Sequence, residues 1–540
     1  MKILLFVACV ILLCIWTSRL SSRFGVPTLL VFIVLGMVFG SDGIFKIPMD
    51  NFRLVQEICG IALAFIMFYG GFGTNWNRAK PVAGKALALS TLGVILTALV
   101  TAVFCHIVLG FGFVESLLIG SVTSSTDAAS VFSILRAQKL NLKENTASLL
   151  ELESGSNDPA SYLMTITALT LLSGTVGGEL AVMTLLQIVA GVLMGLLSAA
   201  FSIFVLNKKR LTVEGFNTLF VLAMVLFSYA LTALLGGNGY LAVYLFGILL
   251  GNSRIIDKVP LVHFFDGVTG QAQIIIFFLL GLLSFPSRIP GIFPTSLAIT
   301  LCLTFLARPA AVFAVLGPAR CSVRQMLLVS FAGLRGAASI VFAIMALTSG
   351  VGGRWDLFHI VFCVCLLSVA FQGTLLPAVA RKLKMVDDGE NVMKTFNDYQ
   401  AEHQLQLVQS RVTPGHPWIG REIGSLNIEL DVLVVMIIRG KRNLVPRGKT
   451  VIKQDDLLVL GGEPFRDAGE VALEEVRLDE RHPWVGQPIK ALPLSDSELV
   501  VLVQYEDGTT AIPHGDTWVN AGDTLVVRRI AIAPPSKKKT

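Results

Sequence analysis

The chain has 540 residues, of which 54% are hydrophobic and only 15% are charged, and its formal net charge is +6. About 25% of the residues of a soluble globular protein are charged, so this composition excludes a soluble enzyme, a disordered protein and a disulfide-rich secreted domain. The charges are unevenly spread, because residues 1–380 hold 36 of them and residues 381–540 hold 44. The first part therefore has the composition of a membrane protein and the second that of a soluble domain.

Thirteen apolar stretches of the first part are candidates for membrane spans, since a helical span needs roughly 20 apolar residues. Fifteen basic residues fall in the loops on one side and four in the loops on the other. The positive-inside rule then puts the N-terminus outside the cell membrane and the C-terminal part in the cytoplasm. The predicted spans are 2–18, 25–41, 55–73, 84–110, 113–135, 147–172, 180–206, 216–235, 239–251, 268–285, 292–316, 325–348 and 357–380.

The fifth predicted span carries an acid and several hydroxyl side chains at its centre. Ser124, Ser125 and Thr126 directly precede Asp127. Ser and Thr side chains compete with the helical backbone for hydrogen bonds, so we expect this helix to be unwound there. A broken helix in the middle of the membrane exposes carbonyls and helix ends that can bind a cation. An acid at this depth in the membrane costs free energy, so its presence indicates a function. Asp127 is therefore a candidate functional acid.

The sixth predicted span concentrates further polar groups between Glu151 and Pro159. Residues 151, 154 and 158 share one helical face, and residues 153 and 157 share the next. Gly155 and Pro159 weaken the helix, so Asp158 is expected to face a polar cavity. Burial favours the protonated carboxyl, whereas a nearby Na⁺ or K⁺ favours the carboxylate, so proton and cation would compete there. The alternative is that these acids only join helices by hydrogen bonds or pair with an arginine.

Two arginines in later spans are candidate counter-charges. Arg335 lies in the twelfth span among Gly and other small residues, so that helix is also expected to be broken. Paired interrupted helices mark the binding sites of many transporters. Arg308, which precedes Pro309 in the eleventh span, is a second buried cation without an assigned role.

These segments resemble those of the monovalent cation/proton antiporters, and most closely the NhaP-like potassium/proton branch. The resemblance rests on residues 125–133, 151–159, 307–309 and 333–337 and extends over about residues 1–385. It implies a polytopic α-helical fold with inverted repeats, two unwound helices that cross, and a homodimer. It also implies electroneutral exchange of H⁺ for a monovalent cation at Asp158, in which Asp127, Thr126, Asn157 and Ser154 take part and Glu153 pairs with Arg335.

One position departs from this family's pattern. Many relatives have an acid before a Gly-Gly pair in the third span, where this chain has Tyr69 before Gly70 and Gly71. Tyrosine can donate a hydrogen bond but carries no charge at neutral pH. The role of that acid therefore cannot be carried over to this chain.

The charge-rich part contains an internal repeat. The segment His416-Pro417-Trp418-Ile419-Gly420 recurs 66 residues later as 482–486, and each copy is followed by β-rich runs and turn signals. Beside Pro and Gly, the His and Trp are better explained as turn and packing residues than as ligands. Each copy is similar to a TrkA-C domain, an α/β unit that commonly forms dimers and binds regulatory ligands such as cyclic di-AMP. The predicted organisation is an exchanger (1–385), a linker (386–404), two TrkA-C-like domains (405–463 and 464–535) and a disordered end (536–540).

The leading functional hypothesis is exchange of K⁺ for H⁺, with Na⁺/H⁺ exchange as the alternative. A ligand-gated cation channel and a membrane sensor are other classes, but the chain lacks a T-V-G-Y-G filter. It also lacks a P-loop and a nucleophile–base set, so we do not expect an enzyme. No C-x-x-C pair and no G-x-G-x-x-G loop occurs in the tail, which predicts no zinc site and no resident nucleotide cofactor. The net charge is explained by loop topology rather than by nucleic-acid binding.

Overall fold

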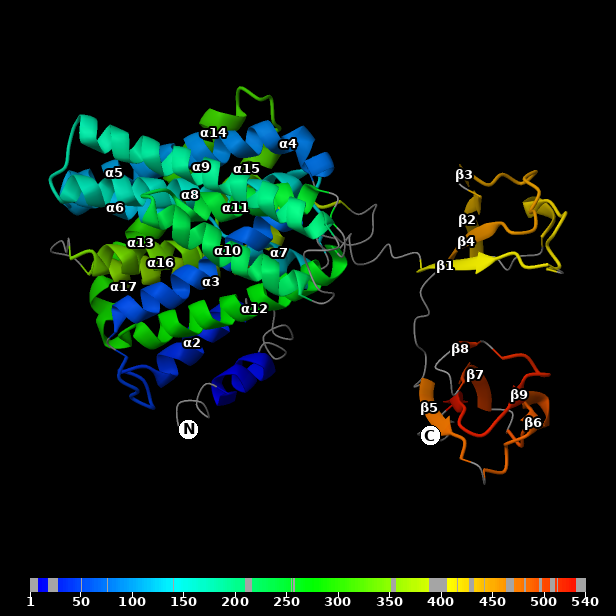
Figure 1. Cartoon of the computed structure of the whole chain (residues 1–540). Helices are drawn as coiled ribbons and strands as arrows, with labels where there is room; N and C mark the ends of the chain where they lie inside the picture. Colours follow the sequence, from blue (N-terminus) through cyan, green and yellow to red (C-terminus); the bar gives the residue numbers. More distant parts are fainter. Residues whose placement is uncertain are drawn as a thin grey trace, which may run out of the picture. The chain divides into compact units, whose positions relative to one another are not determined.

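The computed structural model contains two compact units, residues 1–402 and residues 403–540. The first is a bundle of helices and the second contains β-sheets (Figure 1). The structure describes residues 8–17, 28–49, 51–74, 76–138, 140–208, 216–253, 255, 258–350, 356–387, 406–414, 416–426, 432–440, 442–462, 471–479, 482–494, 498–505, 510–511 and 513–530.

The helices of the first unit follow the predicted spans in order. Among the described residues, seven helical segments are long and apolar enough to cross a membrane, and shorter apolar helices accompany them. Short π-turns join α4 to α5, α13 to α14 and α17 to α18. The predicted polytopic helical fold is therefore confirmed. After a first helix at Ala8–Thr17, the elements are α2 (Thr28–Phe39), α3 (Phe52–Gly73), α4 (Trp76–Ala88), α5 (Val94–Leu109), α6 (Phe113–Ser124), α7 (Ala128–Ala137), α8 (Thr146–Leu172), α9 (Gly178–Asn207), α10 (Asn217–Leu234), α11 (Gly239–Asn252), α12 (Lys258–Leu283), α13 (Ile289–Cys302), α14 (Arg308–Leu316), α15 (Val323–Phe331), α16 (Ala337–Thr348), α17 (Leu357–Leu367) and α18 (Gly373–Lys382).

Helix α12 begins ten residues before the predicted span at 268–285. The ten helical residues that precede this span include Lys258, His263 and Asp266. These polar residues lower the local hydropathy, so a search for apolar runs excludes them although they are helical. The tenth predicted span was therefore too short, and it left out an acid that belongs to the helix.

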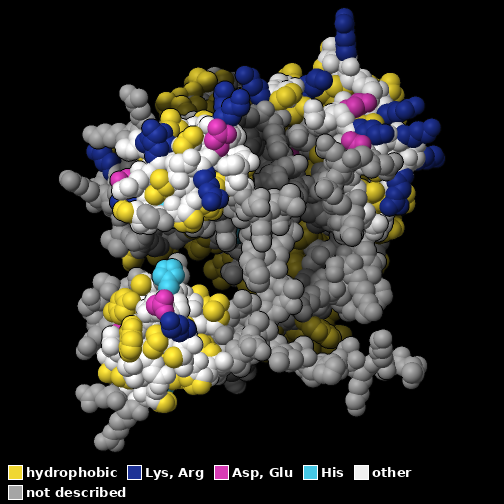
Figure 2. All heavy atoms as spheres, turned by 90° about the vertical axis from the view of Figure 1, so that its right-hand side faces the viewer, with side chains coloured by type: hydrophobic (Ala, Val, Ile, Leu, Met, Phe, Trp, Pro, Cys, Tyr) yellow, Lys and Arg dark blue, Asp and Glu magenta, His cyan; other side chains and the backbone are white. Residues whose placement is uncertain are grey.

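Contacts between loops agree with the predicted alternation of the spans. At one end of the bundle, the backbone N–H of Lys143 donates to Met385 O, and the Ser322 hydroxyl donates to the Glu144 carboxylate. At the other end, Asp42 accepts hydrogen bonds from the backbone and hydroxyl of Ser287. Each contact joins loops that the charge pattern assigns to the same side. Figure 2 shows Lys and Arg side chains on the described surface of the face that it views.

The backbones of helices α3 and α11 are in contact because glycines lie at their crossing. A Cβ built on Gly247 would lie 2.2 Å from Phe68 O, and one built on Gly71 would lie 2.4 Å from Tyr244 O. No real side chain fits at such distances, so both positions require glycine. This is the small-residue packing expected where a membrane supplies no hydrophobic driving force between helices.

The two repeats of the second unit form sheets of the same strand order. The first sheet has the order β1 (Gln406–Arg411), β4 (Leu457–Gly462), β2 (Val432–Arg439), β3 (Arg442–Leu444), and the second has β5 (Val471–Arg477), β10 (Thr524–Ile530), β7 (Glu498–Gln504), β8 (Thr510–Ala511). All pairs are antiparallel, and the register shifts past Val435 in one sheet and past Val501 in the other. These positions are 66 residues apart, so even the β-bulge is repeated. The other described elements of this unit are η5 (Ile423–Ser425), η6 (Ile489–Ala491) and the pair β6 (Gln487–Pro488) and β9 (Trp518–Val519).

The repeated His and Trp interact in the same way in both copies. The backbone N–H of Trp418 donates to His416 Nδ1 at 3.2 Å, and that of Trp484 donates to His482 Nδ1 at 3.3 Å. In each copy the two rings meet edge to face, with centroids 5.2 Å and 5.1 Å apart. This geometry supports the interpretation that the motif shapes a turn.

The two copies differ in the partner of a shared buried acid. In the first, Arg439 donates to both Asp456 oxygens at 2.7 and 2.8 Å, and the Asp456 side chain is fully buried. The Arg439 guanidinium is the main reason that the pKa of Asp456 lies below its usual value. In the second copy, Asp523 accepts from the Asn520 backbone at 2.8 Å, and Tyr505 occupies the position that corresponds to Arg439. The second copy therefore keeps the acid without the arginine.

The first repeat should lose stability in acid through Asp456. Because the folded state lowers the pKa of Asp456, the pair stabilises the fold above the unfolded pKa of about 3.9, and this contribution is lost as the pH falls through the lower folded value. We expect Asp456→Asn to lower the melting temperature of residues 403–540 at neutral pH and to flatten its decline in acid, measured by circular dichroism. The exposed neighbour Asp455 is the control, since Asp455→Asn should leave both unchanged. Equal acid dependence in wild type and Asp456→Asn would contradict this assignment.

Candidate functional site

Two interrupted helices cross within the bundle. Helix α6 ends at Ser124 and α7 begins at Ala128, while α15 ends at Phe331 and α16 begins at Ala337. The backbone N–H of Asp127 donates to Leu334 O at 2.8 Å, so the two irregular segments are in direct contact. A Cβ on Gly336 would lie 2.5 Å from Asp127 Oδ2, so this glycine makes the approach possible. The structure thus contains the broken, crossing helices that the sequence predicts.

Two charged side chains, Arg335 and Asp127, bind the helix ends at this crossing. Arg335 Nη1 donates to Ser124 O at 2.7 Å and to Ser125 O at 2.9 Å, where α6 ends. Asp127 accepts hydrogen bonds from the backbone and the hydroxyl of Ser130 at the start of α7. A cation at a helix C-terminus and an anion at an N-terminus satisfy free backbone groups and complement the helix dipole. Arg335 and Asp127 therefore both stabilise the break.

Helix α8 presents its predicted polar residues to the unwound segment at 125–127. The Ser125 hydroxyl donates to Asp158 Oδ1, and Asn157 Nδ2 donates to Thr126 Oγ1 at 2.5 Å. The Ser154 hydroxyl donates to Thr126 O, also at 2.5 Å. Asp158 is only 6% exposed. The structure therefore brings together Asp158, Asn157, Ser154 and Thr126, with Asp127 as the next residue of the same segment.

Glu153 pairs with Arg308 and not, as the resemblance implied, with Arg335. Arg308 Nη2 lies 2.9 Å from Glu153 Oε2, and both side chains are 1% exposed. Arg335 is instead occupied by the carbonyls at the end of α6. The reason is geometric: Arg308 begins α14 and extends past Gly333, whose missing side chain leaves room for the guanidinium. The predicted pair between Glu153 and Arg335 was therefore wrong.

Several residues that contact the site had no predicted role. Ser125, Ser130 and Ser161 donate hydrogen bonds to Asp158, Asp127 and Ser121 O, respectively. The only advance signal was their place in hydroxyl-rich or broken segments. Arg308 had a clearer signal, since an arginine within an apolar span needs a partner.

The oxygen atoms around Asp158 form a donor set that suits a monovalent cation. The Ser125 hydroxyl binds the carboxylate, and the next residue, Thr126, meets the Asn157 amide with its Oγ1 and the Ser154 hydroxyl with its carbonyl oxygen. Asn157 Oδ1 is buried and accepts no hydrogen bond among the described residues. Hard cations prefer such carboxylate, hydroxyl and amide oxygens. Among the described residues, no three His, Cys, Asp or Glu side chains gather as a metal site would require.

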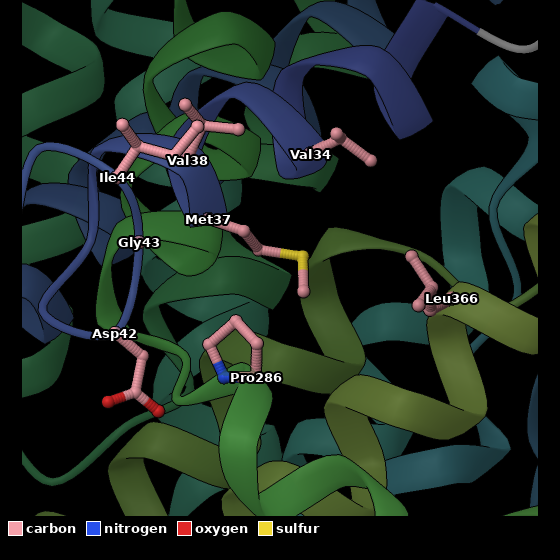
Figure 3. Close-up of a pocket in the computed structure, with 8 residues that line it drawn as sticks. All are labelled: Val34, Met37, Val38, Asp42, Gly43, Ile44, Pro286 and Leu366. Atoms are coloured by element: carbon pink, nitrogen blue, oxygen red, sulfur yellow. The ribbon is translucent and has the colours of Figure 1, made fainter.

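A separate apolar cavity of about 460 Å³ lies between α2, the loop after it, Pro286 just before α13 and Leu366 near the end of α17. Figure 3 shows Val34 and Met37 of α2 on one side of it and Pro286 and Leu366 on the other, with Asp42 at its edge. None of the residues that meet at the crossing lines it. The cavity is therefore distinct from the candidate ion site.

Removing Arg308 should destabilise the protein strongly. Breaking a buried ion pair from one side costs about 3–5 kcal/mol, because the remaining charge is uncompensated. We expect Arg308→Ala to lower the melting temperature of the detergent-solubilised chain, and a second change, Glu153→Gln, to restore part of the loss. Arg335→Ala is the control, because Glu153→Gln should not rescue it. Rescue of Arg335→Ala but not of Arg308→Ala would reverse the pairing.

Comparison with known proteins agrees with this architecture. The family model "sodium/hydrogen exchanger, transmembrane" matches residues 8–382, and the TrkA-C domain model matches residues 407–464. The K(+)/H(+) antiporter NhaP of Alkalimonas amylolytica is 33% identical over 85% of this chain and 80% of its own length. The K(+)/H(+) antiporter NhaP2 of Shewanella sp. (strain MR-4) is 32% identical over 84% and 79%. The solved sodium proton antiporter MjNhaP1 from Methanocaldococcus jannaschii is similar in fold, with a TM-score of 0.63 and 22% identity over 71% of this chain and 99% of that one. The chain therefore belongs to the sodium/hydrogen exchanger family.

Proposed function

We propose that residues 1–385 exchange K⁺ for H⁺ across the cell membrane at Asp158. The observation that carries this proposal is the contact between the buried Asp158 carboxylate and Ser125 of the unwound segment 125–127, whose next residue, Thr126, binds Ser154 and Asn157 of the same helix as Asp158. The carboxylate holds either a proton or a cation, and both cannot be bound at once because each neutralises the same charge. Alternate occupation of one acid is the minimum that exchange requires.

The surrounding charges support an electroneutral exchange. Glu153 is neutralised by Arg308, and the carboxylate of Asp127 is hydrogen-bonded by Ser130 at the start of α7. Asp158 then remains as the acid whose charge can alternate. One proton exchanged for one monovalent cation at a single carboxylate moves no net charge. Thr126, Ser154 and Asn157 supply the neutral oxygens of this site, and Asp127 contributes a nearby negative charge.

The choice of K⁺ over Na⁺ rests on the relatives. Two proteins that match most of this chain are named K(+)/H(+) antiporters. MjNhaP1, which shares the fold at 22% identity, is a sodium proton antiporter. Na⁺/H⁺ exchange is therefore the alternative that the assay must separate.

We further propose that the exchanger is a homodimer whose N-terminus lies outside the cell and whose tail lies in the cytoplasm. The concentration of basic residues in one set of loops supports this orientation. The tail would regulate transport through two domains, 405–463 and 464–535. Most of the predicted linker at 386–404 and all of the predicted end at 536–540 lie outside the residues that the structure describes. The repeated strand order and β-bulge support a duplication. Cyclic di-AMP is the candidate effector.

Inverted membrane vesicles provide the test of transport. We expect addition of K⁺ to release protons from acidified vesicles that contain the chain, with a smaller response to Na⁺. Asp158→Asn should abolish exchange, because an amide neither binds a proton nor neutralises a cation. Normal exchange by Asp158→Asn, or conduction of cations without proton movement, would contradict the proposal. The second result would indicate a channel, and the absence of any flux would favour a sensor.

Calorimetry provides the test of the tail. Titration of residues 403–540 with cyclic di-AMP at micromolar concentration should release heat, and cyclic di-GMP serves as the control nucleotide. Absence of heat with cyclic di-AMP would remove this effector while leaving the transport proposal intact.

A further inference from the structure

An acid outside the crossing lies in the first half of α12. Asp266 is exposed, and Oδ1 of its carboxylate accepts a hydrogen bond from the Tyr69 hydroxyl of α3 at 3.1 Å. The Tyr69 side chain itself is only 6% exposed. The buried ring thus fixes the hydroxyl, and the hydroxyl orients a carboxylate that remains accessible on the other side.

No basic side chain of the described residues forms an ion pair with Asp266. Lys258, the nearest described cation along α12, donates instead to Gly251 O at the end of α11 and lies over the Phe72 ring. The one hydrogen bond that Asp266 accepts from a described side chain comes from a hydroxyl group, which carries no charge to offset that of a carboxylate. An unpaired acid is expensive within a membrane-spanning segment, and where it occurs it faces a polar, water-filled space.

Open space adjoins this pair on both helices. A Cβ built on Gly267 or Gly270 of α12, or on Gly70 of α3, would meet nothing within 4 Å. His263 is exposed one turn before Asp266 on the same face of α12. Helices α3 and α12 run side by side (Figure 1). The exposed surface beside the pair thus carries polar groups and glycines.

A short series of contacts leads from this pair to the ion site. Two residues after Tyr69, Gly71 lies against the backbone oxygen of Tyr244 in α11. The Tyr244 ring in turn lies against Gly155 of α8, with its Cε2 3.5 Å from a Cβ built there. Gly155 follows Ser154, which binds the unwound segment. Helix α3, which carries Tyr69, is therefore linked through α11 to the helix that carries Asp158.

We propose that Asp266, oriented by Tyr69, attracts the transported monovalent cation at the end of the exchanger where α12 begins, which the proposed orientation places in the cytoplasm. This inference rests on the proposed antiport and assigns Asp266 to recruitment, not to the exchange step at Asp158. A negative field at the mouth of an aqueous passage raises the local concentration of cations. It should therefore affect the cation concentration needed for transport rather than the maximal rate.

The test measures exchange in inverted vesicles, whose outer face is the original cytoplasmic face, over a range of K⁺ concentrations. Asp266→Asn should raise the half-maximal K⁺ concentration about three- to tenfold and keep the maximal rate, since a single charge acting across water has an effect of this order. Tyr69→Phe should give a smaller rise, and Asp266→Glu should remain near wild type. Glu57→Gln, which removes an exposed charge from the other end of α3, is the matched control and should change neither value.

Two outcomes would overturn the inference while leaving antiport intact: an unchanged half-maximal concentration in Asp266→Asn, or a lost maximal rate at an unchanged half-maximal concentration. Absence of exchange in the unaltered chain would overturn both proposals.

The accessibility of position 266 to a thiol reagent gives a readout that does not depend on transport. In a chain whose native cysteines are replaced by alanine, Asp266→Cys should react with a membrane-impermeant maleimide in inverted vesicles. Failure to react would show that the site does not face water on that side.

Discussion

The polar backbone of two broken helices must be satisfied inside an apolar bundle, and the rest of the membrane unit is arranged around that requirement. A helix end leaves several N–H and C=O groups without partners, and hydrocarbon offers none. At this crossing the partners come from the chain itself. Asp127 N–H binds Leu334 O, Arg335 binds the last carbonyls of α6, and Asp127 receives hydrogen bonds at the start of α7. The irregular backbone then lies against α8, where Ser154 and Asn157 bind Thr126.

The same arrangement assigns different tasks to similar charges. Arg308 and Arg335 are both buried, but one neutralises a carboxylate and the other binds carbonyl oxygens. Asp127 and Asp158 both receive serine hydroxyls, but only Asp127 accepts from the backbone at a helix start. In the proposed exchange, this separation would leave Asp158 to change its charge while the other three groups hold the structure. It follows from the position of each residue relative to a helix end.

The tail shows how a duplicated unit can keep its fold and lose an interaction. Strand order, β-bulge and the His–Trp turn occur in both copies. The buried acid also occurs in both, bound to the backbone three residues earlier at Lys453 or Asn520. Only the first copy adds the guanidinium of Arg439. The turn thus depends on the backbone contact, and the ion pair is an addition to it.

The sequence by itself determined the helical class, the order of the spans and the positions of the breaks, because hydropathy and helix-breaking residues act locally. It also singled out Asp158, Asn157, Ser154 and Thr126, which the structure brings together. It missed the start of α12, because the polar residues there lower the local hydropathy below that of a membrane span. Only the tertiary structure decided which arginine pairs with Glu153 and which acid meets Tyr69. Those choices depend on distances between helices far apart in the chain, which neither periodicity nor composition encodes.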